Sequence, residues 1–165
     1  MRFTKKLNKL NTLREEKGIG LVEVIAALGI SVIVITALVS LSLYTLRSSL
    51  QSKLQLEATK IANREVEMLR AFRDQNTWTI FRTDTTSCEG GSACYVINAE
   101  GTFSVSSGSI VEVIDGQNMT RSFTLKPDTD DPQDIIEVTV TVTWQIGSQV
   151  KETNLYTHLT NWQNN

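Results

Sequence analysis

The sequence is poor in the side chains on which most catalysis and metal binding depend. Its 165 residues include one histidine, two cysteines and two prolines. A zinc site needs several suitable ligands, and a nucleophile needs a base within hydrogen-bond reach. We therefore expect no enzyme activity, no metal centre and no cofactor. The prolines are Pro127 and Pro132, so proline interrupts no helix earlier in the chain.

The overall composition narrows the class of protein further. Hydrophobic residues make up 41% of the chain and charged residues 21%, with a mean hydropathy of -0.11. These values exclude a polytopic membrane protein, a collagen-like or disordered chain and a small disulfide scaffold. The length suits one folded domain with an appended segment.

Positive charge is concentrated at the N-terminus. Residues 1–18 contain six basic and two acidic side chains, whereas residues 19–165 contain ten basic and sixteen acidic ones. The acidic body argues against a nucleic-acid-binding domain, and no contact with nucleic acid is expected. A basic segment before an apolar one keeps the N-terminus in the cytoplasm, so the body should lie outside.

An apolar segment follows the basic one. Residues 24–46 form a run of 23 residues without a charge, which as a helix spans roughly 35 Å and can cross a bilayer. Cleaved secretory signals have shorter apolar regions, of about 7 to 15 residues. The helical pattern also continues beyond Leu46, because apolar residues recur at helical spacing on one stripe (Leu50, Leu54, Ala58, Ile61, Val66, Leu69 and Phe72). We predict one helix from about Gly20 to Phe72, with an amphipathic second half.

The junction between the two segments has an unusual pattern. Residues 17–24 read K-G-I-G-L-V-E-V, and Glu23 therefore opens an apolar span. An acid there costs on the order of 2 to 3 kcal/mol, so it usually has a partner and a function. This junction resembles the signal of type IV prepilins and pseudopilins, which a membrane aspartyl peptidase cuts after the glycine. The fifth mature residue in that family is glutamate.

The resemblance assigns roles to three residues. Gly18 would precede the scissile bond, Ile19 would be the first mature residue and the candidate for N-methylation, and Glu23 would be the fifth residue. In the family, Glu23 of an incoming subunit would pair with the N-terminal amine of a neighbour and set its axial register during assembly.

The resemblance also implies a domain organisation. Residues 1–18 would be the leader peptide, residues 19–46 the transmembrane and filament-core half of the helix, residues 47–75 its amphipathic half, and residues 76–165 a β-sheet head domain.

A structural function follows from the same resemblance. The chain would be a minor pilin of a type IV pilus, and the alternative is a pseudopilin of a type II secretion or DNA-uptake (competence) system. Expected partners are prepilin peptidase, other pilins or pseudopilins, the inner-membrane assembly platform, and membrane lipid before assembly. The protein would be a single-pass inner-membrane protein with an extracytoplasmic head, then part of a pilus or pseudopilus at the cell surface. A rival from another class is a bitopic extracytoplasmic binding module, which would keep its leader.

The remainder of the chain has the alternation of half-buried strands. Apolar residues occupy every second position from Ile136 to Trp144, and a Gly147–Ser148 turn leads to a partner strand at residues 151–160. A second hairpin is predicted from residues 110–114, a turn at 115–118 and a strand at 119–126. Three or four antiparallel strands with one apolar face should bury that face on the amphipathic helix, which gives an α+β, pilin-like fold.

Cys88 and Cys94 flank a five-residue loop. Because the body is expected in an oxidising space, we predict a disulfide between them, with a reduced pair as the alternative.

A loop between the strands is rich in carboxylates: Asp128, Asp130, Asp131 and Asp134. Such a loop can wrap a calcium ion, but this one lacks the EF-hand spacing, so a solvated acidic turn is preferred. The single histidine, His158, lies in a predicted strand, where a histidine is usually at the surface or packed against neighbours, so no catalytic role is expected for it.

Overall fold

The computed structural model describes residues 20–162, which form two α-helices, a 3-10 turn and six strands. In chain order these are α1 (Leu21–Gln75), α2 (Trp78–Thr85), the 3-10 turn η1 (Thr86–Cys88), β1 (Cys94–Ala99), β2 (Thr102–Ser107), β3 (Ile110–Ile114), β4 (Gln117–Pro127), β5 (Ile135–Ile146) and β6 (Gln149–Thr160). The chain divides into two compact units, and the boundary lies between Leu46 and Arg47, within α1.

Helix α1 ends at Gln75. The apolar stripe predicted an end at about Phe72 and the domain division one at residue 75, because the polar residues after the stripe are compatible with one more helical turn. Asn76 ends that turn, because its side-chain amide donates to the Phe72 carbonyl at 2.8 Å. Thr77 then caps α2 by accepting a hydrogen bond from the backbone N–H of Ile80.

The strands form a single antiparallel sheet in the order β2-β1-β4-β5-β6, and β3 also pairs with β4. The two hairpins predicted from the sequence are present, but their turns are shorter than predicted, because β4 begins at Gln117 and β6 at Gln149. In the first, β3 and β4 are joined at Asp115 and Gly116, which both have positive φ, as a type I′ hairpin turn requires. In the second, β5 and β6 are in register from Ile135↔Thr160 to Ile146↔Gln149.

The prediction of three or four strands was wrong, because β1 and β2 form a third hairpin that it missed. Their turn, Glu100–Gly101, has positive φ at both residues, but Glu-Gly is a weaker turn signal than Asp-Gly or Asn-Gly. Strand β2 is also rich in serine and has no fully buried residue. The alternation of apolar and polar residues, which is strict in β5, is therefore weak in β2.

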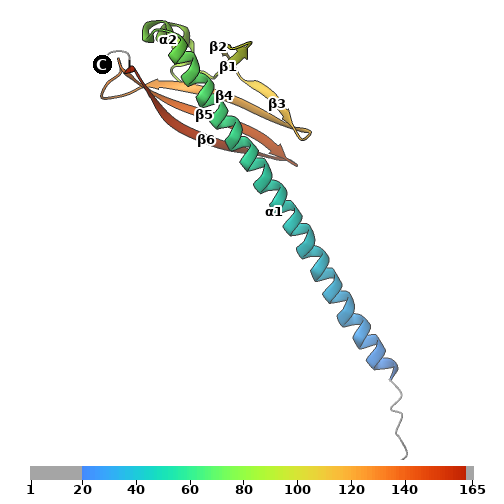
Figure 1. The fold of residues 1–165 in the computed structure, drawn as a ribbon. Coiled ribbons are helices and arrows are strands. Elements are labelled where there is room, and N and C mark those ends of the chain that lie inside the picture. The colour runs from blue at the N-terminus through green and yellow to red at the C-terminus, as the bar shows by residue number, and fades with distance from the viewer. Residues whose placement is uncertain (1–19, 163–165) are drawn as a thin grey trace, which may run out of the picture. The chain divides into compact units, whose positions relative to one another are not determined.

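The α+β fold is confirmed. The part of α1 after Leu46, residues 47–75, packs against one face of the sheet (Figure 1). The alternating residues of β4 and β5 that face the helix are almost completely buried. The core contains Leu54, Ala58, Ile61, Ala62, Val66, Leu69 and Phe72 from α1, Met119, Phe123 and Leu125 from β4, and Ile136, Val138, Val140, Val142 and Trp144 from β5. Each large apolar side chain buried in this way contributes about 1.5 to 3 kcal/mol.

Candidate functional site

The N-terminal part of α1 is an apolar surface. Every residue from Leu21 to Leu46 is exposed, including Leu21 at 77% and Leu38 at 58%, and the first buried residue of the helix is Leu54. The helix is long and apolar enough to cross a membrane. So much exposed aliphatic surface is unfavourable in water and requires lipid or protein around it.

The serine and threonine side chains of this segment are satisfied by the helix itself. The hydroxyl groups of Ser31, Thr36, Ser40 and Ser42 donate to the carbonyl four residues earlier at 2.8–2.9 Å, and Thr45 donates to Ser42. A hydroxyl without a partner in an apolar medium is costly, whereas a bonded one is tolerated. The segment therefore suits burial in lipid or among other apolar helices despite its five serine and threonine hydroxyl groups.

Glu23 is the acidic residue in the first turn of α1. Its backbone N–H donates to the Gly20 carbonyl at 2.9 Å, and its carboxylate benefits from the positive end of the helix dipole. No residue between 20 and 162 forms a hydrogen bond or an ion pair with this carboxylate. The predicted cleavage residues Gly18 and Ile19 lie outside the described part of the chain.

A buried charge cluster connects α1 to the sheet. Glu65 is fully buried, and its carboxylate pairs with the Arg121 guanidinium from β4 and accepts from the Val96 N–H at 2.6 Å. Arg121 also donates to Glu112 Oε1 at 2.6 Å and to the Val96 carbonyl at 3.1 Å. Glu112 in turn pairs with Arg64. One network thus joins α1 to β1, β3 and β4.

Burial lowers the pKa of the Arg121 guanidinium to about 10, and the nearby Arg64 acts in the same direction. The group therefore stays cationic at neutral pH, where the Glu65 carboxylate compensates it. Sequence reasoning missed this pair. A signal was present, because Glu65 lies four residues after Ile61 and four before Leu69, within the apolar stripe.

The predicted disulfide between Cys88 and Cys94 is confirmed. The two Cα atoms are 5.5 Å apart and both side chains are fully buried. The bond connects η1 to the first residue of β1, where Cys94 is in register with Phe123 of β4. It therefore ties the segment after α2 to the middle of the sheet.

Reducing this disulfide is expected to lower the free energy of unfolding by about 2 kcal/mol, because its short loop restricts the unfolded chain only moderately. The measurement is urea unfolding of the detergent-solubilised protein, with and without reductant, followed by tryptophan fluorescence. All three tryptophans, Trp78, Trp144 and Trp162, belong to the unit of residues 47–165. A Cys88→Ala, Cys94→Ala variant should not respond to reductant. An equal urea midpoint with and without reductant in the wild type would contradict the prediction.

The acidic loop is organised by its own carboxylates. Asp128 Oδ1 accepts from the N–H groups of Asp130 and Asp131 at 2.8 and 3.2 Å, and Asp131 Oδ1 accepts from the Asp134 N–H at 3.2 Å. The two backbone hydrogen bonds hold the pKa of the Asp128 carboxyl below its usual value. Asp134 accepts from the Asn161 side chain, which ties the loop to the end of β6. These contacts give the carboxylates a structural role, and the preference for a solvated acidic turn over a calcium site stays a prediction.

His158 is exposed, which decides between the surface and packed alternatives. Its Nε2 lies 4.0 Å from Glu137 Oε1 on the neighbouring strand. Within residues 20–162, Asp128, Glu137 and His158 are the group of three whose metal-ligating atoms all lie within 4.8 Å of one another. Asp128 and His158 each stand out in the sequence, but their proximity depends on the strand order, which the sequence does not reveal.

Comparison with known proteins found no matching family model, no similar curated protein and no similar solved structure. The structure itself has the coarse features that the pilin resemblance predicts, namely a long apolar N-terminal helix and an antiparallel sheet packed on its amphipathic continuation.

Proposed function

We propose that this protein is a minor pilin, a structural subunit of a type IV pilus that prepilin peptidase processes. The observation that carries the proposal is the exposed apolar helix from Leu21 to Leu46, which has Glu23 in its first turn and follows a prepilin-like Gly18–Ile19 junction. A solvated protein gains nothing from such a surface, whereas a subunit that passes from a bilayer into a helical filament core needs it in both environments.

The segment is suited to both stages of such an assembly. Before assembly, its aliphatic side chains would contact lipid and its bonded hydroxyl groups would cost little there. After assembly, the same side chains would pack against apolar helices of other subunits. Glu23 then needs a cation, and the α-amino group of Ile19 on a neighbouring subunit is the one that cleavage would create.

The head would be carried on the same helix. Helix α1 continues without interruption from Leu21 to Gln75, and its last part is held to the sheet by apolar packing and by the Glu65–Arg121 pair. In the proposed pilus, the disulfide and this pair would keep the head folded outside the cytoplasm, and prepilin peptidase and the assembly platform would act on the N-terminal segment.

Cleavage between Gly18 and Ile19 is the first test of this proposal. It removes 18 of the 165 residues and leaves a mature chain of 147 that begins Ile-Gly-Leu-Val-Glu-Val. Intact mass spectrometry of the membrane-extracted protein should find this chain, and Gly18→Phe should block its formation because the site then carries a bulky side chain. Gly29→Ala is the matched control, since the added methyl group there meets open space. An intact N-terminus in cells with active prepilin peptidase would overturn the proposal and favour a bitopic binding module.

A pseudopilin of a type II secretion or DNA-uptake system would use the same processed helix. Immunogold labelling of the processed protein separates the two functions. Label along extended surface filaments supports the minor pilin, whereas label confined to the cell envelope supports the pseudopilin.

A further inference from the structure

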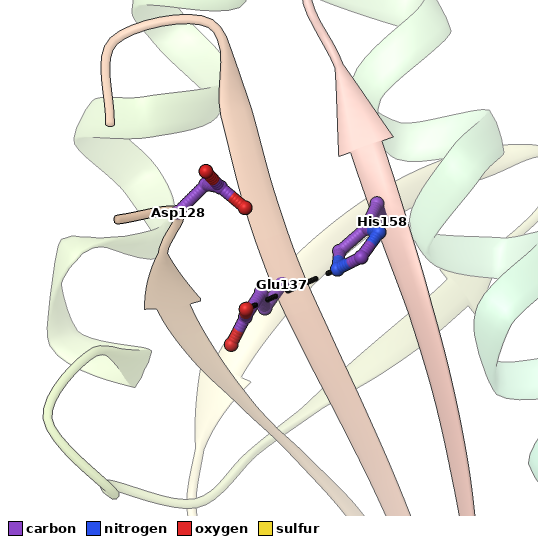
Figure 2. A group of neighbouring side chains, drawn as sticks. All are labelled: Asp128, Glu137 and His158. Carbon is purple, nitrogen blue, oxygen red and sulfur yellow. Dashed lines mark ion pairs between the residues drawn. The ribbon is translucent and has the colours of Figure 1, made fainter. Parts of the chain in front are cut away.

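Three side chains of types that can ligate a metal lie close together on the outer face of the sheet. Asp128 follows the end of β4, Glu137 belongs to β5 and His158 belongs to β6 (Figure 2). Each offers one ligand atom, and these atoms lie within 4.8 Å of one another. The side chains come from three segments, so the cluster is a product of the sheet and not of one loop.

The register of the strands explains why Glu137 and His158 meet. They are directly opposed across the β5–β6 ladder, and directly opposed residues project from the same face. That face is opposite the helix-packed core, because the neighbours Ile136 and Val138 are buried while Glu137 is partly exposed and His158 is exposed. A dissolved ion can therefore reach the cluster.

Asp128 is held in place before any ligand arrives. Its Oδ1 accepts both backbone hydrogen bonds from the loop, which leaves Oδ2 for a ligand. Glu137 likewise uses its two oxygens differently, because Oε2 pairs with Lys126 at 3.2 Å and Oε1 faces His158. Each carboxylate thus has one oxygen for a metal without loss of its present contact.

The donor set selects the class of metal. One imidazole nitrogen with two carboxylate oxygens suits Zn²⁺, whereas Ca²⁺ and Mg²⁺ prefer oxygen ligands alone. In a tetrahedral zinc site with ordinary bond lengths the ligand atoms are about 3.3 Å apart. The 4.0 Å between His158 Nε2 and Glu137 Oε1 then requires only a small side-chain adjustment, which an exposed imidazole can make.

We propose that Asp128, Glu137 and His158 form a three-ligand Zn²⁺ site with an open fourth position on the surface of the head. Zinc would link the end of β4 to β5 and β6, and because it binds the folded head it would stabilise it. The open position would accept water or a ligand from another molecule. This inference is independent of the pilin assignment, since it rests on the sheet alone.

Lys126 opposes the proposed ion. It is directly opposite Glu137 in the β4–β5 register, and its ammonium group is paired with that carboxylate. An ammonium group 3.2 Å from Glu137 Oε2 would repel a zinc ion bound to the same carboxylate. Because two-thirds of the Lys126 side chain is exposed, it can move away into solvent when the ion binds. Lys126→Met should therefore strengthen zinc binding severalfold, and this gain is hard to explain unless Glu137 takes part in the site.

The test uses the full-length protein without an affinity tag, in detergent and in chelator-free buffer, titrated with Zn²⁺ alone. Because His158 is the only histidine, the imidazole signals in a histidine-labelled NMR sample report on this site and on no other. We expect saturable shifts at one Zn²⁺ per chain, and calorimetry should show affinity at least about tenfold weaker in His158→Gln and in Glu137→Gln. Asp130→Asn should bind as the wild type does, since its side chain is outside the cluster.

Two results would overturn the site. One is an absence of saturable imidazole shifts in wild-type protein whose tryptophan fluorescence shows a folded head. The other is equal zinc affinity in wild type and His158→Gln, which would place the ion elsewhere. If the first of these results is found together with calcium binding that His158→Gln leaves unchanged, the acidic loop is favoured instead.

Discussion

Glu23→Ala is expected to reduce incorporation into filaments to less than about a tenth of the wild-type level, with cleavage, membrane insertion and head folding unchanged. In the proposed assembly, the Glu23 carboxylate pairs with the N-terminal amine of a neighbouring subunit inside an apolar core. Leaving one of these charges without its partner there costs several kcal/mol, and each 1.4 kcal/mol corresponds to a factor of about ten. The measurement compares the protein in sheared filament and membrane fractions at matched expression.

Two further variants make the result specific. Glu57→Ala removes a carboxylate from the same helix, but from a surface pair with Lys60, and it should assemble as the wild type does. Glu23→Gln keeps the size of the side chain and removes its charge, so it should fail as Glu23→Ala does. Equal incorporation of Glu23→Ala and wild type would reject the pairing mechanism and leave the fold unaffected.

Arg121→Met is expected to lower the free energy of unfolding of the head by about 3 to 5 kcal/mol, because it leaves the Glu65 carboxylate buried without a cation. Glu65 is fully buried and Arg121 nearly so, and water cannot reach the remaining charge without disrupting the contact between α1 and the sheet. Urea unfolding of the detergent-solubilised protein, followed by tryptophan fluorescence, measures the loss.

A double-mutant cycle separates the cost of an unpaired charge from the loss of packing. Glu65→Met combined with Arg121→Met removes both charges and should be more stable than Arg121→Met alone. Lys60→Met, which breaks an exposed ion pair on the same helix, should change stability by no more than about 0.5 kcal/mol. If the double variant is as unstable as the sum of the two single variants, the pair contributes no coupling and the argument fails.

Local patterns were sufficient for the elements with strong periodicity. The long helix followed from an uncharged run that continues as a stripe at helical spacing, and the β5–β6 hairpin followed from strict alternation around Gly147–Ser148. The disulfide was predictable because Cys88 and Cys94 are the two cysteines of the chain and the head is expected in an oxidising space. Each of these inferences concerns residues that are close in the chain.

Features that depend on strand order needed the tertiary structure. Glu65 and Arg121 are 56 positions apart, and Glu65 meets Arg121 because the helix lies across β4. Asp128, Glu137 and His158 come together because β4, β5 and β6 are neighbours in one register, and a shift of one residue would turn Glu137 or His158 to the other face.

The sequence by itself therefore determined an apolar segment, its acidic opening residue and a head of mixed helix and sheet. Only the tertiary structure decided which charges are buried and which ligands converge. The physical reason is that periodicity reveals which face of an element is apolar, whereas contacts between distant elements depend on how those faces pack.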